Sequence, residues 1–219
     1  MAAAQSTSNA PQSYGWQIAF GAAGAATLGL LAAVPAKAAP TVGEPAPAFT
    51  GTTAEGETVS LDDYAGKTVI LEWTNDGCPY VRKHYDSGNM QALQREAKQD
   101  DIVWLTVISS APGKQGYATG PQAISIAEEA GAMPGEIVLD PSGEIGHAYD
   151  ARTTPHMYIV DAQGTLRYMG GIDDRPTADK ADIDGATNYV SAALDDMQAG
   201  REVARANTPP YGCSIKYGS

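Results

Sequence analysis

The feature that most constrains the fold of this chain is a short apolar strand that leads through a tight turn into a helix. Residues 67–74 are mostly apolar and β-branched, which predicts a buried strand, and the sequence Asn75-Asp76-Gly77 after them predicts a turn. Proline is tolerated at the first helical position, so we expect a helix to begin at Pro79. We therefore expect Cys78 to lie between a buried strand and the N-terminus of a helix.

Strand and helix patterns alternate through the rest of the chain. Further strands are expected at residues 101–110, 136–140, 156–161 and 165–169, and further helices at 90–98, 122–130 and 188–198. This order is typical of an α/β fold in which helices cover both faces of a central sheet. We assign residues 39–208 to this one domain and residues 209–219 to a C-terminal tail.

The first 38 residues differ from the rest in composition. They contain no acidic residue and one basic residue, Lys37, and residues 18–34 form an apolar run rich in Ala, Gly and Leu. As a helix this run would span about 25 Å, less than the ~30 Å hydrocarbon core of a membrane. Ala36-Lys37-Ala38 then matches the small-residue cleavage site of secretory signals. We expect residues 1–38 to be a cleaved signal peptide, with an uncleaved membrane anchor as the alternative. In both cases the domain is exported, to the periplasm if the source is bacterial.

The charge balance argues against several classes of partner. The chain has 14 basic and 26 acidic residues and a net charge of −12. Nucleic-acid binding needs a basic surface that displaces phosphate counterions, and an anionic membrane surface would repel this chain. We also expect no nucleotide cofactor and no other bound cofactor, since no glycine-rich nucleotide loop follows a predicted strand. A membrane becomes a partner only if the leader stays uncleaved.

Cys78 is the strongest candidate for a reactive group. Unpaired backbone N–H groups and the dipole at a helix N-terminus stabilise a thiolate, and Arg82 and Lys83 add positive charge nearby. A helix that starts after a buried strand begins at an exposed corner in α/β folds, so we expect Cys78 to be accessible. The alternative is a buried cysteine that acts as a small hydrophobic residue.

Four short motifs carry a resemblance to known redox proteins. They are Asp76-Gly77-Cys78-Pro79-Tyr80-Val81, Ser87-Gly88-Asn89-Met90-Gln91, Thr154-Pro155 and Gly212-Cys213-Ser214-Ile215-Lys216. Together they resemble the peroxiredoxin-like branch of the thioredoxin superfamily, the alkyl hydroperoxide reductase/thiol-specific antioxidant group, over residues 41–217. The resemblance implies a thioredoxin-like α/β fold, with a central mixed sheet and helices on both faces, and thiol-based redox activity.

The resemblance also implies roles for individual residues. Cys78 would be the nucleophile, Pro155 would form a cis-proline loop facing it, and Glu72 would be a buried carboxylate that moves protons. The substrate pocket would comprise Thr74, Asn75, Pro79, Tyr80 and Thr154. An unpaired carboxylate within an apolar strand is unfavourable, which separately favours a role for Glu72. The alternative is a carboxylate that reaches solvent or pairs with a base.

Three positions depart from the family pattern. Val81 stands in place of the second cysteine of C-x-x-C, Asn75 in place of the peroxiredoxin Thr or Ser, and Pro155 in place of its arginine. The mechanism that uses two adjacent thiols is therefore unavailable, and we expect an exported, cysteine-dependent thiol–disulfide oxidoreductase of the peroxiredoxin-like type. A thiol peroxidase whose pocket is rebuilt from Thr74, Asn75 and Arg152 is the first alternative.

The remaining alternatives concern binding and structure. One is a non-enzymatic binding or metallochaperone module on the same fold, and another treats the two cysteines as a static structural link. We expect no metal site, because His84 together with the one soft ligand Cys78 would hold copper poorly. The acid-rich residues 173–184 are expected to form a solvated loop.

Cys213, in the tail, is the candidate resolving thiol. Attack of one thiol on the oxidised form of the other would link it to Cys78. The alternatives, that Cys213 is buried or pairs with another chain, stay open, because spacing does not determine disulfide connectivity. The expected partner is a thiol reductant or a disulfide-bearing protein, with a small peroxide as a further candidate.

Overall fold

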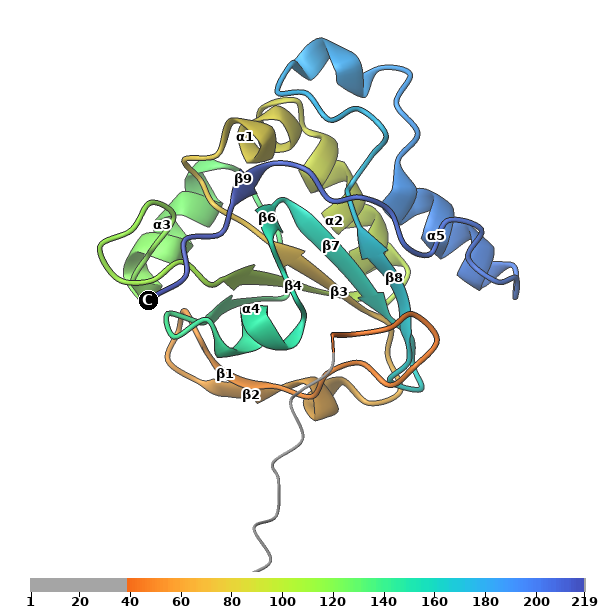
Figure 1. Ribbon diagram of the computed structural model, residues 1–219, viewed down its shortest axis with the longest axis horizontal. Helices are drawn as coiled ribbons and strands as arrows, with labels where there is room; N and C mark the ends of the chain where they lie inside the picture. The colour runs from red at the N-terminus through yellow and green to blue at the C-terminus, as the bar shows by residue number, and fades with distance from the viewer. Residues whose placement is uncertain (1–38, 219) are drawn as a thin grey trace, which may run out of the picture. The chain divides into compact units, whose positions relative to one another are not determined.

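A seven-stranded mixed sheet forms the centre of the domain. The computed structural model describes residues 39–218. The strands lie in the order β2-β1-β5-β4-β3-β7-β8 (Figure 1). They are β1 (Thr50–Thr53), β2 (Thr58–Ser60), β3 (Val69–Trp73), β4 (Val103–Ile108), β5 (Glu136–Leu139), β7 (His156–Val160) and β8 (Leu166–Gly170). Strands β3, β4 and β5 are parallel, whereas β7 is antiparallel to β3 and β8 to β7.

Helices cover both faces of this sheet, as the alternating pattern predicts. The helices are α1 (Pro79–Asp86), α2 (Asn89–Gln99), α3 (Gly120–Glu129), α4 (Glu144–Ala148) and α5 (Tyr189–Gln198), with two short 3-10 turns, η1 (Leu61–Tyr64) and η2 (Lys180–Ile183). On one face, Ile70 of β3 packs in a cluster with Met90 of α2 and Val190 of α5. On the other face, Trp73 packs in a cluster with Ile145 of α4. The thioredoxin-like α/β architecture is therefore confirmed.

The alternation of side chains along β3 explains why this strand contributes residues to both hydrophobic clusters. Successive residues of a strand point to opposite faces, so Leu71 and Trp73 enter one cluster and Ile70 enters the other. Glu72 shares the face of Ile70, and it lies opposite Thr106 of β4 and Met157 of β7 in the sheet register. A carboxylate thus occupies the middle of the sheet.

A second, two-stranded sheet connects the end of the chain to the domain. Strand β6 (Thr153–Thr154) pairs antiparallel with β9 (Cys213–Ser214). The C-terminal segment, residues 206–218, runs from β8 past β6 and ends beside the segment that connects β4 and α3, as Figure 1 shows in dark blue. Three backbone hydrogen bonds fix it at separate places: Thr208 donates to Met169, Ile215 donates to Arg152, and Ala111 donates to Lys216.

Residues 173–184 are only in part the solvated loop expected from their acidic composition. Most of them are half-buried or exposed, but Asp173 is buried, with 3% of its surface exposed. The expectation is wrong for Asp173 because a basic side chain from α1, Lys83, pairs with it inside the protein.

The predicted leader lies outside the described residues. Within residues 39–218, the structure contains no helix with the length and apolar character needed to cross a membrane.

Candidate functional site

Cys78 lies at the predicted junction of strand and helix, but it is not exposed there. It is the N-cap residue of α1, and its carbonyl oxygen accepts the first helical hydrogen bond, from Arg82, at 3.0 Å. Its exposed fraction is 0%. The expectation of an accessible corner is therefore wrong. The reason is that the C-terminal segment, far away in sequence, lies directly beside the sulfur.

The Cys78 sulfur contacts two backbone groups. As a thiol, its Sγ donates to the carbonyl oxygen of Thr154 at 3.1 Å, and Sγ accepts from the backbone amide of Cys213 at 3.4 Å. The Thr154–Pro155 peptide bond is cis, as the resemblance implies. The structure thus gathers Cys78, Thr154, Pro155 and Cys213 at one place.

Hydrogen bonds make Cys78 the more acidic of the two thiols. Burial alone would raise the pKa of Cys78, but hydrogen bonds from the side chains of Cys213 and Thr154 and from the amides of Val81 and Cys213 outweigh it and lower that pKa below 9.0. Burial, together with the neighbouring Cys78, raises the pKa of Cys213 to about 11. Of the two thiols, Cys78 therefore has the lower pKa.

Gly212 permits this close approach of the C-terminal segment. Its φ is +132°, and a Cβ atom at this position would lie 2.0 Å from the carbonyl oxygen of Thr154. A glycine is required here because a side chain would collide with backbone. Cys213 is consequently placed opposite Thr154 in the β6–β9 pair. Both cysteines are free thiols.

Glu72 is fully buried and has its own set of partners. Its carboxylate accepts from the Tyr85 hydroxyl at 3.0 Å and from Trp104 Nε1 at 2.9 Å, with Thr106 Oγ1 at 3.4 Å. Burial raises the pKa of Glu72 to about 7, although these hydrogen bonds act to lower it. Among residues 39–218, no hydrogen bond connects Glu72 to Cys78.

Of the residues expected to bind a peroxide, Asn75 contacts Cys78 directly, because its carbonyl oxygen accepts from the Cys78 amide at 3.0 Å. Thr74 and Asn75 line a cavity of about 290 Å³ between α1, α3 and the sheet, and the described residues that line it do not include Cys78. Arg152 is exposed, and its Nε lies 3.7 Å from a carboxylate oxygen of Asp150.

Pro79 and Tyr80 open α1 beside the sulfur. Pro79 is exposed, and the Tyr80 ring makes an edge contact with the ring of Tyr211, with centroids 5.9 Å apart. Tyr80 thus contacts the C-terminal segment at Tyr211, which is two residues before Cys213.

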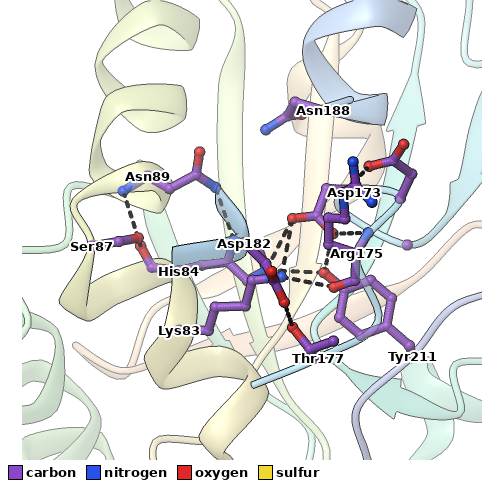
Figure 2. A network of polar contacts seen from close by, with 12 residues as sticks. Lys83, His84, Ser87, Asn89, Asp173, Arg175, Thr177, Asp182, Asn188 and Tyr211 are labelled. Atoms are coloured by element: carbon purple, nitrogen blue, oxygen red, sulfur yellow. Dashed lines mark hydrogen bonds and ion pairs between the residues drawn. The ribbon is translucent and has the colours of Figure 1, made fainter. Parts of the chain in front are cut away.

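A buried polar cluster beside α1 is the part of the site that the sequence did not reveal. Lys83 and His84 of α1 meet Asp173 and Tyr211, as Figure 2 shows. These four residues, called the Asp173 cluster below, come from three segments distant in sequence. The one sequence feature that points to this cluster is the position of Tyr211 two residues before Cys213, and that position alone does not predict which residues Tyr211 contacts.

His84 takes part in this cluster through its ring nitrogens, which contact Asn89 and Tyr211. Within residues 39–218, the structure shows no group of three or more His, Cys, Asp or Glu side chains arranged to hold a metal ion. Burial lowers the pKa of His84 to about 4, more than the nearby Asp173 raises it, so the ring is neutral at physiological pH.

Comparison with known proteins identifies the family. The profile of the AhpC/TSA family matches residues 42–169, which contain Cys78, Glu72 and the Thr154-Pro155 pair. The chain belongs to the AhpC/TSA family. Cys213 and two members of the Asp173 cluster, Asp173 and Tyr211, lie beyond the matched residues.

Individual proteins are similar to this chain in sequence or in structure. Proteins from two Mycobacterium tuberculosis strains, which carry provisional peroxiredoxin names, are each 28% identical over 136 residues, covering 61% of this chain and 79% of theirs. An uncharacterised conserved protein from Geobacillus kaustophilus is similar in structure, with a TM-score of 0.71 and 26% identity over 81% of this chain and 93% of that one. A hypothetical protein from Sinorhizobium meliloti shares the fold, with a TM-score of 0.69 and 21% identity over 83% and 97% of the two chains.

Proposed function

We propose that this member of the AhpC/TSA family is an exported thiol–disulfide oxidoreductase that cycles through a disulfide between Cys78 and Cys213. The observation that carries the proposal is the contact between the two cysteines, in which the amide of Cys213 donates to the Cys78 sulfur at 3.4 Å. The lowered pKa of Cys78 beside the raised pKa of Cys213 supports a division into nucleophile and resolving thiol.

The reaction proceeds by two exchange steps. The Cys78 thiolate attacks one sulfur of a substrate disulfide, which forms a mixed disulfide and releases the other substrate sulfur as a thiolate. Cys213 then gives up its proton to that thiolate or to solvent and attacks the Cys78 sulfur. The Cys78–Cys213 bond forms and the second substrate thiolate leaves. The two cysteines lose two electrons and the substrate disulfide gains two. A dithiol donor reverses both steps and restores the reduced protein.

The burial of Cys78 requires that β9 moves before a substrate arrives. The β6–β9 sheet contains two residue pairs, Thr153 with Ser214 and Thr154 with Cys213, so little backbone pairing must open. Segments with few backbone pairs open at low free energy. The partner is accordingly a protein or small molecule with an accessible disulfide or thiol pair.

A peroxidase activity is the second candidate, favoured by family membership and by the peroxiredoxin names of the mycobacterial relatives. In that reaction the Cys78 thiolate would attack a peroxide oxygen, form a sulfenic acid and release an alcohol or water. Cys213 would then form the same disulfide and release water. The exposed position of Arg152, whose guanidinium lies beside the Asp150 carboxylate, favours disulfide exchange over this reaction.

One experiment separates these functions from a binding module. The purified chain is incubated with oxidised glutathione or with hydrogen peroxide, and the cysteine products are identified by mass spectrometry without reduction. We expect oxidised glutathione to give the Cys78–Cys213 disulfide, and Cys213→Ser to accumulate a glutathione adduct on Cys78. Rapid disulfide formation with peroxide alone would instead favour the peroxidase. If neither reagent reacts with the chain faster than it reacts with a free thiol, the result would indicate a non-enzymatic module. Export is tested separately, by N-terminal sequencing of the chain from fractionated cells.

A further inference from the structure

Asp173 is the centre of a buried cluster that touches both α1 and the C-terminal segment. Its Oδ2 lies 3.4 Å from Lys83 Nζ, and the side chains of this pair are 2% and 0% exposed. Its Oδ1 accepts from the Tyr211 hydroxyl at 2.5 Å and from the Arg175 amide at 2.8 Å. One carboxylate therefore holds a helix, a loop and the C-terminal segment together, as Figure 2 shows.

The hydrogen bonds of this cluster run in one direction. Asn89 Nδ2 lies 2.9 Å from His84 Nδ1 and must donate to it, because an amide nitrogen cannot accept. The neutral His84 ring then carries its proton on Nε2, which donates to the Tyr211 hydroxyl at 3.2 Å. That hydroxyl in turn donates to Asp173. Each polar atom in this chain has a fixed role, so Tyr211 has one favoured orientation.

Lys83 completes the cluster from the other side of Tyr211. Its Nζ donates to the carbonyl oxygen of Arg175 at 2.7 Å and lies 5.6 Å from the centroid of the Tyr211 ring. Tyr80 also packs against that ring. The Tyr211 ring is consequently held by residues of α1, whose N-cap is Cys78, and its hydroxyl is held by His84 of α1 and by Asp173.

Tyr211 precedes Cys213 by two residues, with Gly212 between them. On the far side of Cys213, the Tyr217 hydroxyl donates to the carbonyl oxygen of Ala151 at 2.7 Å, so the segment is anchored on both sides of the thiol. Cys213 itself is held by its pairing with Thr154, and Tyr211 adds a side-chain anchor just before it. We propose that Asp173 and Tyr211 are positioning residues that set the location of Cys213 relative to Cys78 and thereby the reduction potential of the pair.

The physical link is the effective concentration of one thiol at the other. A disulfide forms more favourably when its two sulfurs are already held together, and it becomes easier to reduce when the connecting segment is free to move. The Tyr211 hydroxyl binds a charged group, and hydrogen bonds of that kind are among the stronger ones. Loss of the Tyr211 hydroxyl should therefore free the part of the C-terminal segment before Cys213, while Tyr217 still anchors the part after it.

The inference rests on the proposed function, and the test keeps the two apart. The full chain and its Tyr211→Phe variant are equilibrated in reduced and oxidised glutathione, and the Cys78–Cys213 disulfide is quantified by mass spectrometry. We expect the equilibrium constant for disulfide formation to fall about tenfold in Tyr211→Phe, a rise of about 30 mV in the reduction potential. Asp173→Asn should also lower this equilibrium constant. Tyr189→Phe is the control, because it removes a tyrosine hydroxyl that bonds to Arg205 on the surface.

Urea unfolding of the same proteins distinguishes positioning from simple stabilisation. A Tyr211→Phe variant that unfolds more easily but keeps the wild-type potential would show that the cluster is only structural, and would overturn the inference. An equal shift in Tyr189→Phe would overturn it as well. If the wild-type chain forms no Cys78–Cys213 disulfide in any glutathione ratio, the proposed function fails and the inference fails with it.

Discussion

Cys213 lies opposite Thr154 in the β6–β9 pair, and from there its backbone amide donates to the sulfur of Cys78, 135 residues earlier in the chain. Val81 occupies the position where a C-x-x-C motif has its second cysteine. In this chain the second thiol therefore reaches the first through a backbone pairing at the end of the chain. Events that loosen β9 should change both the acidity and the accessibility of Cys78.

The first prediction concerns acidity. Cys213→Ala removes the thiol that hydrogen-bonds to the Cys78 sulfur and leaves the backbone amide in place. We expect the pKa of Cys78 to rise, because the thiolate loses one of the hydrogen bonds that stabilise it against the effect of burial. Thiolate absorbance near 240 nm, followed against pH, measures this. Ser214→Ala, an exposed change in the same strand, should leave the midpoint where it is. An unchanged midpoint in Cys213→Ala would contradict the role given to the second thiol.

The second prediction concerns accessibility. In Gly212→Ala, the new Cβ would lie 2.0 Å from the Thr154 carbonyl oxygen at a φ of +132°, so β9 must move away from β6. Strain of this kind costs about 1–3 kcal/mol, and we expect iodoacetamide to modify Cys78 about tenfold faster than in the wild type. Peptide mass spectrometry after timed quenching gives the rate.

Gly218→Ala is the matched control for that change. It places a methyl group in the same C-terminal segment, where the nearest atom is the Ala111 side chain at 3.8 Å. Its alkylation rate should equal that of the wild type. Equal rates in all three proteins would mean that β9 does not limit access to the sulfur.

The sequence was sufficient to predict the strand–turn–helix unit around Cys78, because its signals are local. The apolar run of β3, the turn after it and Pro79 at the start of α1 each act over a few residues. The cis bond at Pro155 was expected from the resemblance and is present. The β1–β2 hairpin, the short helix α4 and the two-residue strands β6 and β9 escaped prediction, since such short segments carry too little periodicity.

The burial of Cys78 and the Asp173 cluster could not be read from local pattern. The groups that contact the Cys78 sulfur belong to Thr154 and Cys213, and the buried partner of Lys83 is 90 residues away. An aspartate in an acidic stretch and a lysine on a helix both suggest solvent exposure, which is the usual state of such residues. Their burial depends on tertiary contacts, which composition and periodicity do not encode.

A third prediction tests the charge state of the Asp173 cluster. Burial lowers the pKa of His84 to about 4, so the ring should stay neutral down to acidic pH, with its proton on Nε2. Nitrogen NMR of histidine-labelled protein reports both the protonation state and the tautomer. Free histidine in the same buffer, which has a pKa of about 6.5, provides the reference. Protonation of His84 near that reference value, or a proton on Nδ1 in the neutral form, would contradict the directed hydrogen-bond chain.

The last prediction concerns the buried carboxylate. Burial raises the pKa of Glu72 from 4.5 to about 7, so the folded protein favours its protonated form. The stability that this gives is present at acidic pH and is lost as pH rises from about 4.5 to about 7, by up to about 3 kcal/mol. Glu72→Gln keeps an oxygen acceptor for Trp104 but cannot ionise. We expect the variant to gain stability relative to the wild type across that window, and to keep the full gain at pH 8.

The comparison must be made as a difference between the two proteins at each pH. Burial lowers the pKa of His84 to about 4 and that of His156 to about 3, so both histidines add stability as pH rises from acid and oppose the effect of Glu72. They are present in both proteins and cancel in the difference between the two free energies of unfolding. Urea unfolding at pH 5, 6, 7 and 8 gives that difference. If it does not change with pH, Glu72 is ionised in the folded state at all of these values. Its carboxylate would then be stabilised by Tyr85, Trp104 and Thr106 more strongly than burial opposes it.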